Sequence, residues 1–110
     1  DAKITAQLVS ALTGLKAAEA EQLVVAYEPL WAIGTGKAAT AADAQEVCQL
    51  VRKELVQLFG EAVARKIRVL YGGSVNEKNA ASFCIKGIDG VLVGGASLKV
   101  DTFSTIVRSF

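Results

Sequence analysis

The sequence predicts an α/β fold built on a short parallel sheet, and three observations lead to this prediction. Short apolar runs, each long enough for one strand, recur at residues 23–27, 67–71 and 91–93. Apart from Arg68 these runs are continuous rather than alternating, as in strands that are covered on both faces. Between them the apolar period becomes helical. Strands joined by helices form right-handed parallel crossovers, so three parallel strands with intervening helices are expected.

Two helices are expected before the second strand. The opening stretch predicts the first, because its apolar residues keep a helical period up to a glycine: Ile4, Leu8, Val9 and Leu12, then Gly14. The second begins after Thr40, whose hydroxyl can cap it, with Asp43 three residues later as in a weak capping box. A stripe at helical spacing, apolar apart from Glu54, then continues to Gly60 and consists of Val47, Leu50, Val51, Glu54, Leu55 and Leu58.

Two further helices are expected around the third strand. Asn76 can cap one that stops near Gly87 and carries Ala80, Phe83 and Cys84. Asp101 can cap the last one, whose inner face would hold Phe103, Ile106 and Val107. The predicted order is therefore helix, strand, helix, strand, helix, strand, helix.

One pattern occurs twice, which indicates a repeated unit. Residues 69–74 (VLYGGS) and 91–96 (VLVGGA) each place paired glycines at the end of a strand, 22 residues apart. Ligands of α/β proteins bind at this end of the strands. Three strands alone leave two unpaired edges and a small core. We therefore expect residues 1–110 to be a single partial domain, one piece of a larger fold.

The composition excludes several classes of function. With 52% hydrophobic and 21% charged residues, the chain is expected to fold. Twelve basic and eleven acidic residues leave a formal net charge of +1, too little to favour binding to nucleic acid or to an anionic membrane. No apolar run reaches the length of a membrane-spanning helix.

The absence of histidine excludes further chemistry within this chain. It removes Ser-His-Asp and Cys-His nucleophile systems and every metal site with a histidine ligand, and we expect no metal and no cofactor. Cys48 and Cys84 lie in apolar-periodic stretches and are expected to be buried, reduced thiols. Reduced thiols are typical of an intracellular protein.

Three features could carry chemistry. Glu28 ends the first strand, where partial burial would suit a general base, although it could equally be an exposed strand-end glutamate. Residues 29–37 are apolar yet interrupted by glycines, as in a loop that closes over a site or in an ordinary surface loop. The glycines at residues 72–73 and 94–95 could converge on one phosphate, or mark tight turns.

Together these segments resemble a known family. Residues 26–37 (AYEPLWAIGTGK), 71–75 (YGGSV) and 93–98 (VGGASL) are closely similar to the carboxyl-terminal part of the triosephosphate isomerase family, in the same order. The resemblance implies that the three strands are the sixth to eighth of a (β/α)8 TIM barrel. Such a barrel takes about 250 residues, so this chain covers less than half of it.

The resemblance also implies a role for each motif. Glu28 would be the base that moves a proton between C1 and C2 of a triose phosphate through an enediol(ate), interconverting dihydroxyacetone phosphate and glyceraldehyde 3-phosphate. Substrate phosphate would be bound by backbone N–H groups of Gly34, Ser74, Gly94 and Gly95. A lid would consist of the hinge Pro29, Leu30 and Trp31, the tip Ala32, Ile33, Gly34, Thr35 and Gly36, and the hinge Lys37, Ala38 and Ala39. The Tyr71 hydroxyl and Ser74 would hold this lid closed.

The family's catalytic lysine and electrophilic histidine belong to earlier strands and have no counterpart here. The expectation is therefore a cytoplasmic enzyme of glycolysis and gluconeogenesis, a homodimer in its family, whose carboxyl-terminal segment is active only with the missing amino-terminal part. Two alternatives remain open. One is a phosphate-binding but inert partial barrel. The other is a structural fragment whose open edges pair with further copies to rebuild a barrel.

Overall fold

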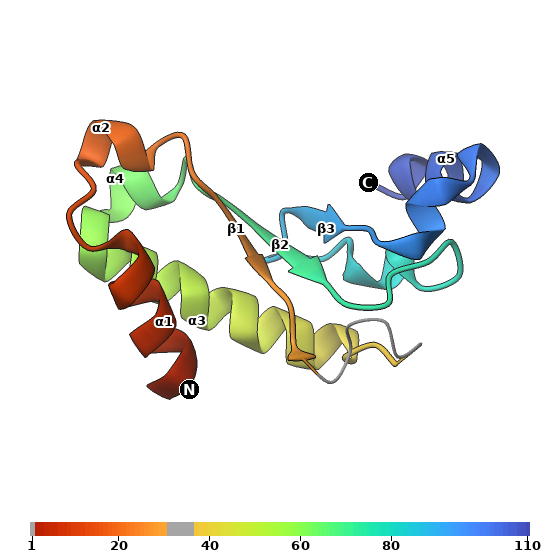
Figure 1. Ribbon diagram of the computed structural model, residues 1–110, viewed down its shortest axis with the longest axis horizontal. Coiled ribbons are helices and arrows are strands. Elements are labelled where there is room, and N and C mark those ends of the chain that lie inside the picture. Colours follow the sequence, from red (N-terminus) through yellow and green to blue (C-terminus); the bar gives the residue numbers. More distant parts are fainter. Residues whose placement is uncertain (1, 31–36) are drawn as a thin grey trace.

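The computed structural model describes residues 2–30 and 37–110 and contains one parallel sheet. Its strands lie in the order β1 (Val24–Tyr27), β2 (Arg68–Gly72) and β3 (Gly90–Leu92) (Figure 1). Tyr27 is level with Tyr71, and Tyr71 with Val91. The predicted α/β class and parallel sheet are confirmed, and each strand begins and ends within one residue of its predicted bounds.

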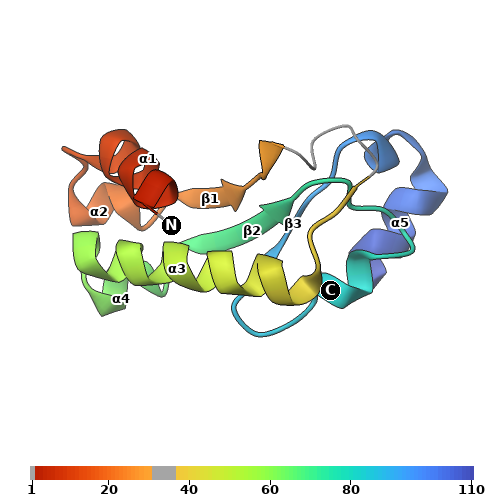
Figure 2. The same ribbon diagram turned by 90° about the horizontal axis from the view of Figure 1, so that it is seen from below.

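Five α-helices are present in the described residues: α1 (Ala2–Leu12), α2 (Ala17–Ala20), α3 (Ala41–Phe59), α4 (Glu61–Ala64) and α5 (Val100–Arg108). The longest, α3, begins as predicted, because the Asp43 N–H donates to Thr40 Oγ1 at 3.1 Å. It ends at Gly60, whose φ of +84° suits a glycine. Figure 2 shows α3 running along one face of the sheet. None of these helices has the combined length and hydropathy that crossing a membrane requires.

The helix predicted between Asn76 and Gly87 is wrong. This segment contains only a 3₁₀ turn, η2 (Ala80–Phe83). The side-chain oxygen of Asn76, Oδ1, accepts from the N–H groups of Lys78 and Asn79, at 2.8 and 3.0 Å. In turn, Asn79 Oδ1 accepts from the Asn76 N–H. Side-chain bonds of this kind offer the backbone an alternative to a regular helix, so the first turn does not continue.

The prediction for the last helix is only partly confirmed. Lys99 rather than Asp101 occupies the cap position of α5, and Asp101 lies in the first turn. Ile106 is buried, but Phe103 and Val107 are 41% and 56% exposed. The reason is the position of α5, which lies at one end of the molecule and packs mainly against the 3₁₀ turn η3 (Gly95–Leu98) (Figure 1). No second layer covers its other apolar residues among those described.

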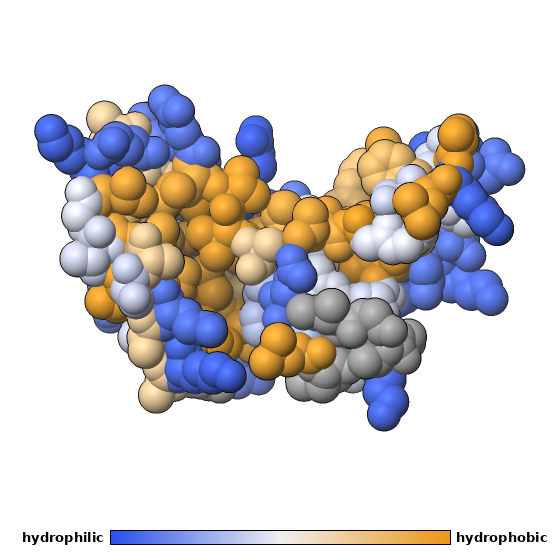
Figure 3. Space-filling model, viewed as in Figure 1, coloured by the Kyte–Doolittle hydropathy of each residue, from blue (hydrophilic) through white to orange (hydrophobic). Residues whose placement is uncertain are grey.

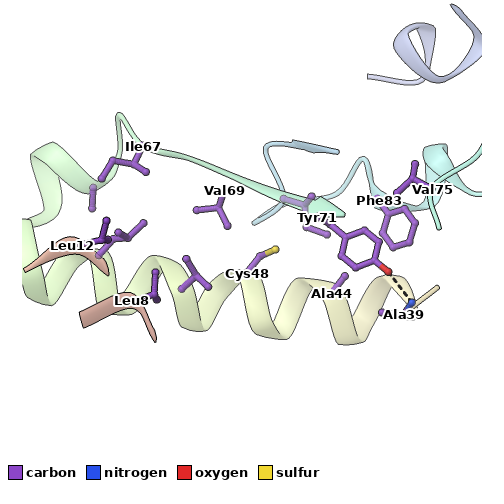
Figure 4. Packing of buried hydrophobic residues seen from close by; sticks show 14 of the residues in the cluster. Leu8, Leu12, Ala39, Ala44, Cys48, Ile67, Val69, Tyr71, Val75 and Phe83 are labelled. Atoms are coloured by element: carbon purple, nitrogen blue, oxygen red, sulfur yellow. Dashed lines mark hydrogen bonds between the residues drawn. The ribbon is translucent and has the colours of Figure 1, made fainter. Parts of the chain in front are cut away.

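The core lies between α3 and the sheet. Cys48 of α3 lies beside Val69 and Tyr71 of β2, and two leucines of α1, Leu8 and Leu12, close one end of the cluster (Figure 4). Val51 and Leu55 of α3 belong to the same buried cluster. Burial raises the pKa of the Cys48 thiol to about 11. The second cysteine is exposed, which contradicts its predicted burial, because it follows η2 rather than lying on the inner side of a helix.

A polar cluster ties the amino ends of the strands to α3. Arg52 donates to the carbonyl oxygens of Ala64 and Ile67, the latter at 2.7 Å, and to Asp89 Oδ2 at 2.5 Å. The same Asp89 oxygen accepts from the Val69 N–H, and the Asp89 N–H donates to the Val69 carbonyl, both at 2.8 Å. One carboxylate therefore joins α3, β2 and the start of β3.

The other face of the sheet is open, so the predicted cover on both faces is wrong for this chain. Val24 of β1 and Leu92 of β3 are 53% and 46% exposed, whereas Val69 and Tyr71, which face α3, are fully buried. Figure 3 shows apolar side chains gathered across the middle of the molecule, over β1 and β2. The continuous apolar runs therefore include residues that have no packing partner in the described chain.

Candidate active site

The carboxyl ends of the three strands border one pocket of about 290 Å³. Its lining comes from residues that end or follow each strand: Glu28, Gly72, Gly73, Ser74, Leu92, Val93 and Gly94. The structure thus brings together five of the residues singled out in the sequence, namely Glu28, Gly72, Gly73, Ser74 and Gly94. Gly95 follows directly, as the first residue of η3, but is outside the lining.

Glu28 directly follows β1 and extends over the neighbouring strand. A Cβ at Gly72 would lie 2.9 Å from Glu28 Cγ and 3.3 Å from Leu92 Cβ, so the glycine leaves the room that the glutamate occupies. The Glu28 side chain is exposed, which contradicts the expected partial burial. This exposure agrees with that of Val24 and Leu92, which belong to the same uncovered face of the sheet.

Tyr71 is the buried anchor beside the pocket. Its hydroxyl accepts from the Ala39 N–H at 2.9 Å and donates to the Gly73 carbonyl at 3.0 Å, and its ring stacks on Phe83 (Figure 4). Burial raises the pKa of Tyr71, although the bond from the Ala39 N–H acts in the opposite direction. The hydroxyl therefore stays protonated near neutral pH. It links the end of the predicted lid to the turn after β2.

Ser74 has an unusual backbone. Its φ of +54° is in the left-handed region, which is uncommon for a residue other than glycine. The carbonyl of Ser74 accepts from Asn79 Nδ2 at 3.0 Å, so the asparagine helps to hold this turn. Strained backbone of this kind is concentrated at functional sites.

Sequence reasoning did not single out Asn79 or Leu92 as part of this site. A signal for Asn79 existed in its spacing from Asn76, because two asparagines three residues apart can accept hydrogen bonds from the backbone N–H groups of one turn. A signal for Leu92 was its place two residues before Gly94, on the same strand face as the pocket.

Gly94 and Gly95 have space in front of them. A Cβ on either residue would have no described heavy atom within 4 Å, apart from those of its own chain neighbours. Packing among the described residues therefore does not require a glycine at these positions. Glycines in such a place let a ligand approach the backbone N–H groups closely.

The two ends of the predicted lid are anchored unequally. Pro29 is buried, whereas Leu30 is 75% exposed. Beyond the gap Lys37 is exposed, Ala38 is half-buried and Ala39 is buried. The remaining lid residues lie outside the described part of the chain, so their roles stay predictions: Trp31, Ala32, Ile33, Gly34, Thr35 and Gly36.

A metal centre is not evident in residues 2–30 and 37–110, where no three His, Cys, Asp or Glu side chains gather as metal ligands would. Of the described residues, those that line the pocket offer one carboxylate, one serine and the backbone around the glycines for chemistry. Such a set can accept a proton and bind an anion.

Comparison with known proteins points to one family. The family model described as triosephosphate isomerase matches residues 1–110. The triosephosphate isomerase of Carboxydothermus hydrogenoformans is 55% identical over 108 residues, covering 97% of this chain and 43% of that protein. That of Nocardia farcinica is 57% identical over 101 residues, covering 91% and 39%, and that of Acetivibrio thermocellus is 52% identical over 111 residues, covering 96% and 44%. The chain spans about two fifths of the length of these relatives.

Proposed function

Because this chain belongs to the triosephosphate isomerase family, we propose that it supplies the base, the lid and the phosphate site of an enzyme that interconverts dihydroxyacetone phosphate and glyceraldehyde 3-phosphate. Its three parallel strands with their helices are a partial TIM barrel. The observation that best supports the proposal is the pocket that joins Glu28 to Ser74 and Gly94 at the carboxyl ends of the strands.

Glu28 is the proposed base. Its carboxylate removes a proton from C1 or C2 of the triose phosphate and returns it to the other of these two carbons, through an enediol(ate). The developing oxyanion needs an electrophile, which is supplied by a histidine and a lysine from the missing amino-terminal part. This chain has no histidine, so we expect it to be inactive by itself.

The substrate phosphate is proposed to bind to backbone N–H groups of Gly34, Ser74, Gly94 and Gly95. The left-handed backbone of Ser74 and the free space at Gly94 and Gly95 support this assignment. Binding energy from the phosphate, remote from the reacting carbons, can be used to stabilise the transition state.

Residues 29–39 form the proposed lid, which closes over the substrate, excludes water and protects the enediolate. The bond between the Ala39 N–H and the Tyr71 hydroxyl supports a fixed trailing end for this segment. In the proposal, Tyr71 and Ser74 hold the closed lid through bonds to its backbone.

The proposed partners are a triose phosphate and the amino-terminal part of the barrel, in a cytoplasmic homodimer that serves glycolysis and gluconeogenesis without a cofactor. The open apolar face and the length of the relatives support the need for that second part. The same open face favours one alternative, in which further copies of this chain cover it and no turnover occurs. A phosphate-binding but inert partial barrel is the other alternative.

The test joins this chain to the amino-terminal part of the Carboxydothermus hydrogenoformans relative and measures isomerase turnover. We expect turnover in the joined protein and none in the chain alone. Glu28→Gln should reduce turnover by about 10³-fold, while inorganic phosphate still inhibits competitively in the residual reaction. Glu46→Gln, at an exposed glutamate on α3, is the matched control and should leave turnover unchanged. A folded joined protein without turnover, or an active Glu28→Gln variant, would contradict the proposal.

A further inference from the structure

The open face of the sheet has a simple layered composition. Successive side chains of a strand point to opposite faces, and Val69 and Tyr71 point toward α3, so Arg68 and Leu70 belong to the open face. In the strand register Val24 is level with Arg68, and the next row of neighbouring residues on this face, called a layer here, holds Ala26, Leu70 and Gly90. Gly72 and Leu92 form the layer at the pocket, beside Glu28. Between the two ends the face is apolar.

Arg68 is the cation of this face, at the amino end of the central strand. Its side chain forms no hydrogen bond or ion pair with any residue in the described part of the chain, in contrast to Arg52, Arg65 and Lys66, which pair with acidic side chains. Asp89 lies at the same end of the sheet, but its carboxylate already accepts from Arg52 and from the Val69 N–H. A guanidinium remains charged at every pH at which proteins fold.

The rest of the family's fold is the occupant of this face. The relatives are more than twice as long as the segment that they share with this chain. Both outer strands, β1 and β3, have one edge unpaired within the described residues. Strands that pair with those edges and close the barrel would cover the Val24, Leu70 and Leu92 side chains and exclude water from them.

Closing the barrel also places Arg68 among apolar side chains. Removing a guanidinium from water without a partner is strongly unfavourable. Its five N–H donors lie in a planar fork that matches the two oxygens of a carboxylate. The charge of Arg68, the geometry of its donors and its apolar surroundings therefore all favour an acidic side chain as its partner.

We propose that the amino-terminal part of the barrel places an Asp or Glu carboxylate against Arg68, at the amino ends of the strands. This ion pair lies at the end of the sheet opposite the Glu28 pocket. On an otherwise apolar face, which could dock in several registers, one charge pair fixes the orientation of the two parts. The inference rests on the completed barrel of the proposed function, but not on its catalysis.

The test uses the same joined protein, with the amino-terminal part of the Carboxydothermus hydrogenoformans relative. Urea unfolding compares Arg68→Met with the control Arg65→Met, which removes an arginine from an exposed pair with Glu61. We expect Arg68→Met to raise the equilibrium constant for unfolding at least 100-fold, because it leaves a buried carboxylate unpaired. Arg65→Met should raise it less than threefold. Equal effects of the two substitutions would overturn the proposal.

A second measurement identifies the partner. Each acidic residue of the added strands is replaced by Leu, alone and together with Arg68→Met, and one of these substitutions should rescue Arg68→Met. Rescue by none would mean that Arg68 reaches water or a backbone carbonyl, which also overturns the proposal. If Arg68→Met does not fold, Arg68→Lys should remain more stable than Arg68→Gln. Turnover separates the two proposals, since a folded but inactive joined protein contradicts only the proposed function.

Discussion

Replacing Tyr71 with phenylalanine removes one oxygen atom from the centre of the molecule and leaves the ring in place. The stack on Phe83, with ring centroids 4.4 Å apart, is kept. The buried Ala39 N–H loses its acceptor, which lies 2.9 Å away in the native chain, and the Gly73 carbonyl loses a donor. Gly73 is only half-buried, so water can replace that second bond. The Ala39 N–H therefore carries most of the cost.

A buried N–H without a partner costs about 1–3 kcal/mol. We therefore expect Tyr71→Phe to lower the free energy of unfolding by about 2 kcal/mol, which multiplies the equilibrium constant for unfolding by about 30. For a urea dependence of about 1.5 kcal/mol per M, the unfolding midpoint should fall by about 1 M. Far-UV circular dichroism during urea titration of the 110-residue chain measures this shift.

Tyr27→Phe is the matched control. Tyr27 lies next to Tyr71, at a centroid distance of 6.4 Å, but its hydroxyl forms no hydrogen bond with a residue that the structure describes. Its replacement should change the free energy of unfolding by less than about 0.5 kcal/mol. If the two variants unfold at the same urea concentration, the Tyr71 hydroxyl does not anchor residue 39 and the reasoning is refuted.

Three further predictions concern the core and the amino ends of the strands. Burial raises the pKa of Cys48 to about 11 from about 9, so the thiol loses its proton at lower pH in the unfolded chain than in the folded one. The free energy of unfolding should therefore fall between pH 9 and 11, and urea titrations should show a smaller fall for Cys48→Ala. Arg52→Met should lower the free energy of unfolding by about 2 kcal/mol. Arg52→Lys should recover little, because a single ammonium nitrogen lacks the planar fork whose two nitrogens reach carbonyls and a carboxylate on different elements; an unchanged urea midpoint would contradict this. A maleimide should label Cys84 in the folded chain and Cys48 only after unfolding, and mass spectrometry showing two labels on the native chain would refute that difference.

Local signals predicted the sheet and the longest helix. Continuous apolar runs fixed the three strands to within one residue, and the Thr40 hydroxyl with Asp43 marked the start of α3. The position of Glu28 and of the paired glycines at strand ends was enough to expect one common pocket, because parallel strands end at the same edge.

Other features depend on contacts that a pattern does not contain. The region after Asn76 has a helical period, but competition from the Asn76 and Asn79 side chains ends the helix after one turn. The left-handed backbone of Ser74 needed coordinates. The exposure of Val24 and Leu92 has a different cause, since these side chains suit the interior of a whole barrel and the present chain covers only one side of them.

The hydrogen bonds of Asp89 have a consequence at a distance. A strand of only three residues could shift its register along its neighbour with few hydrogen bonds lost. The register of β3 is held at its amino end, because Asp89 forms hydrogen bonds with both the N–H and the carbonyl of Val69. A slip of two residues would carry Leu92 and Gly94 about 7 Å along the sheet, away from Glu28. The alignment of the pocket wall is therefore decided at the far end of the strand, away from the pocket itself.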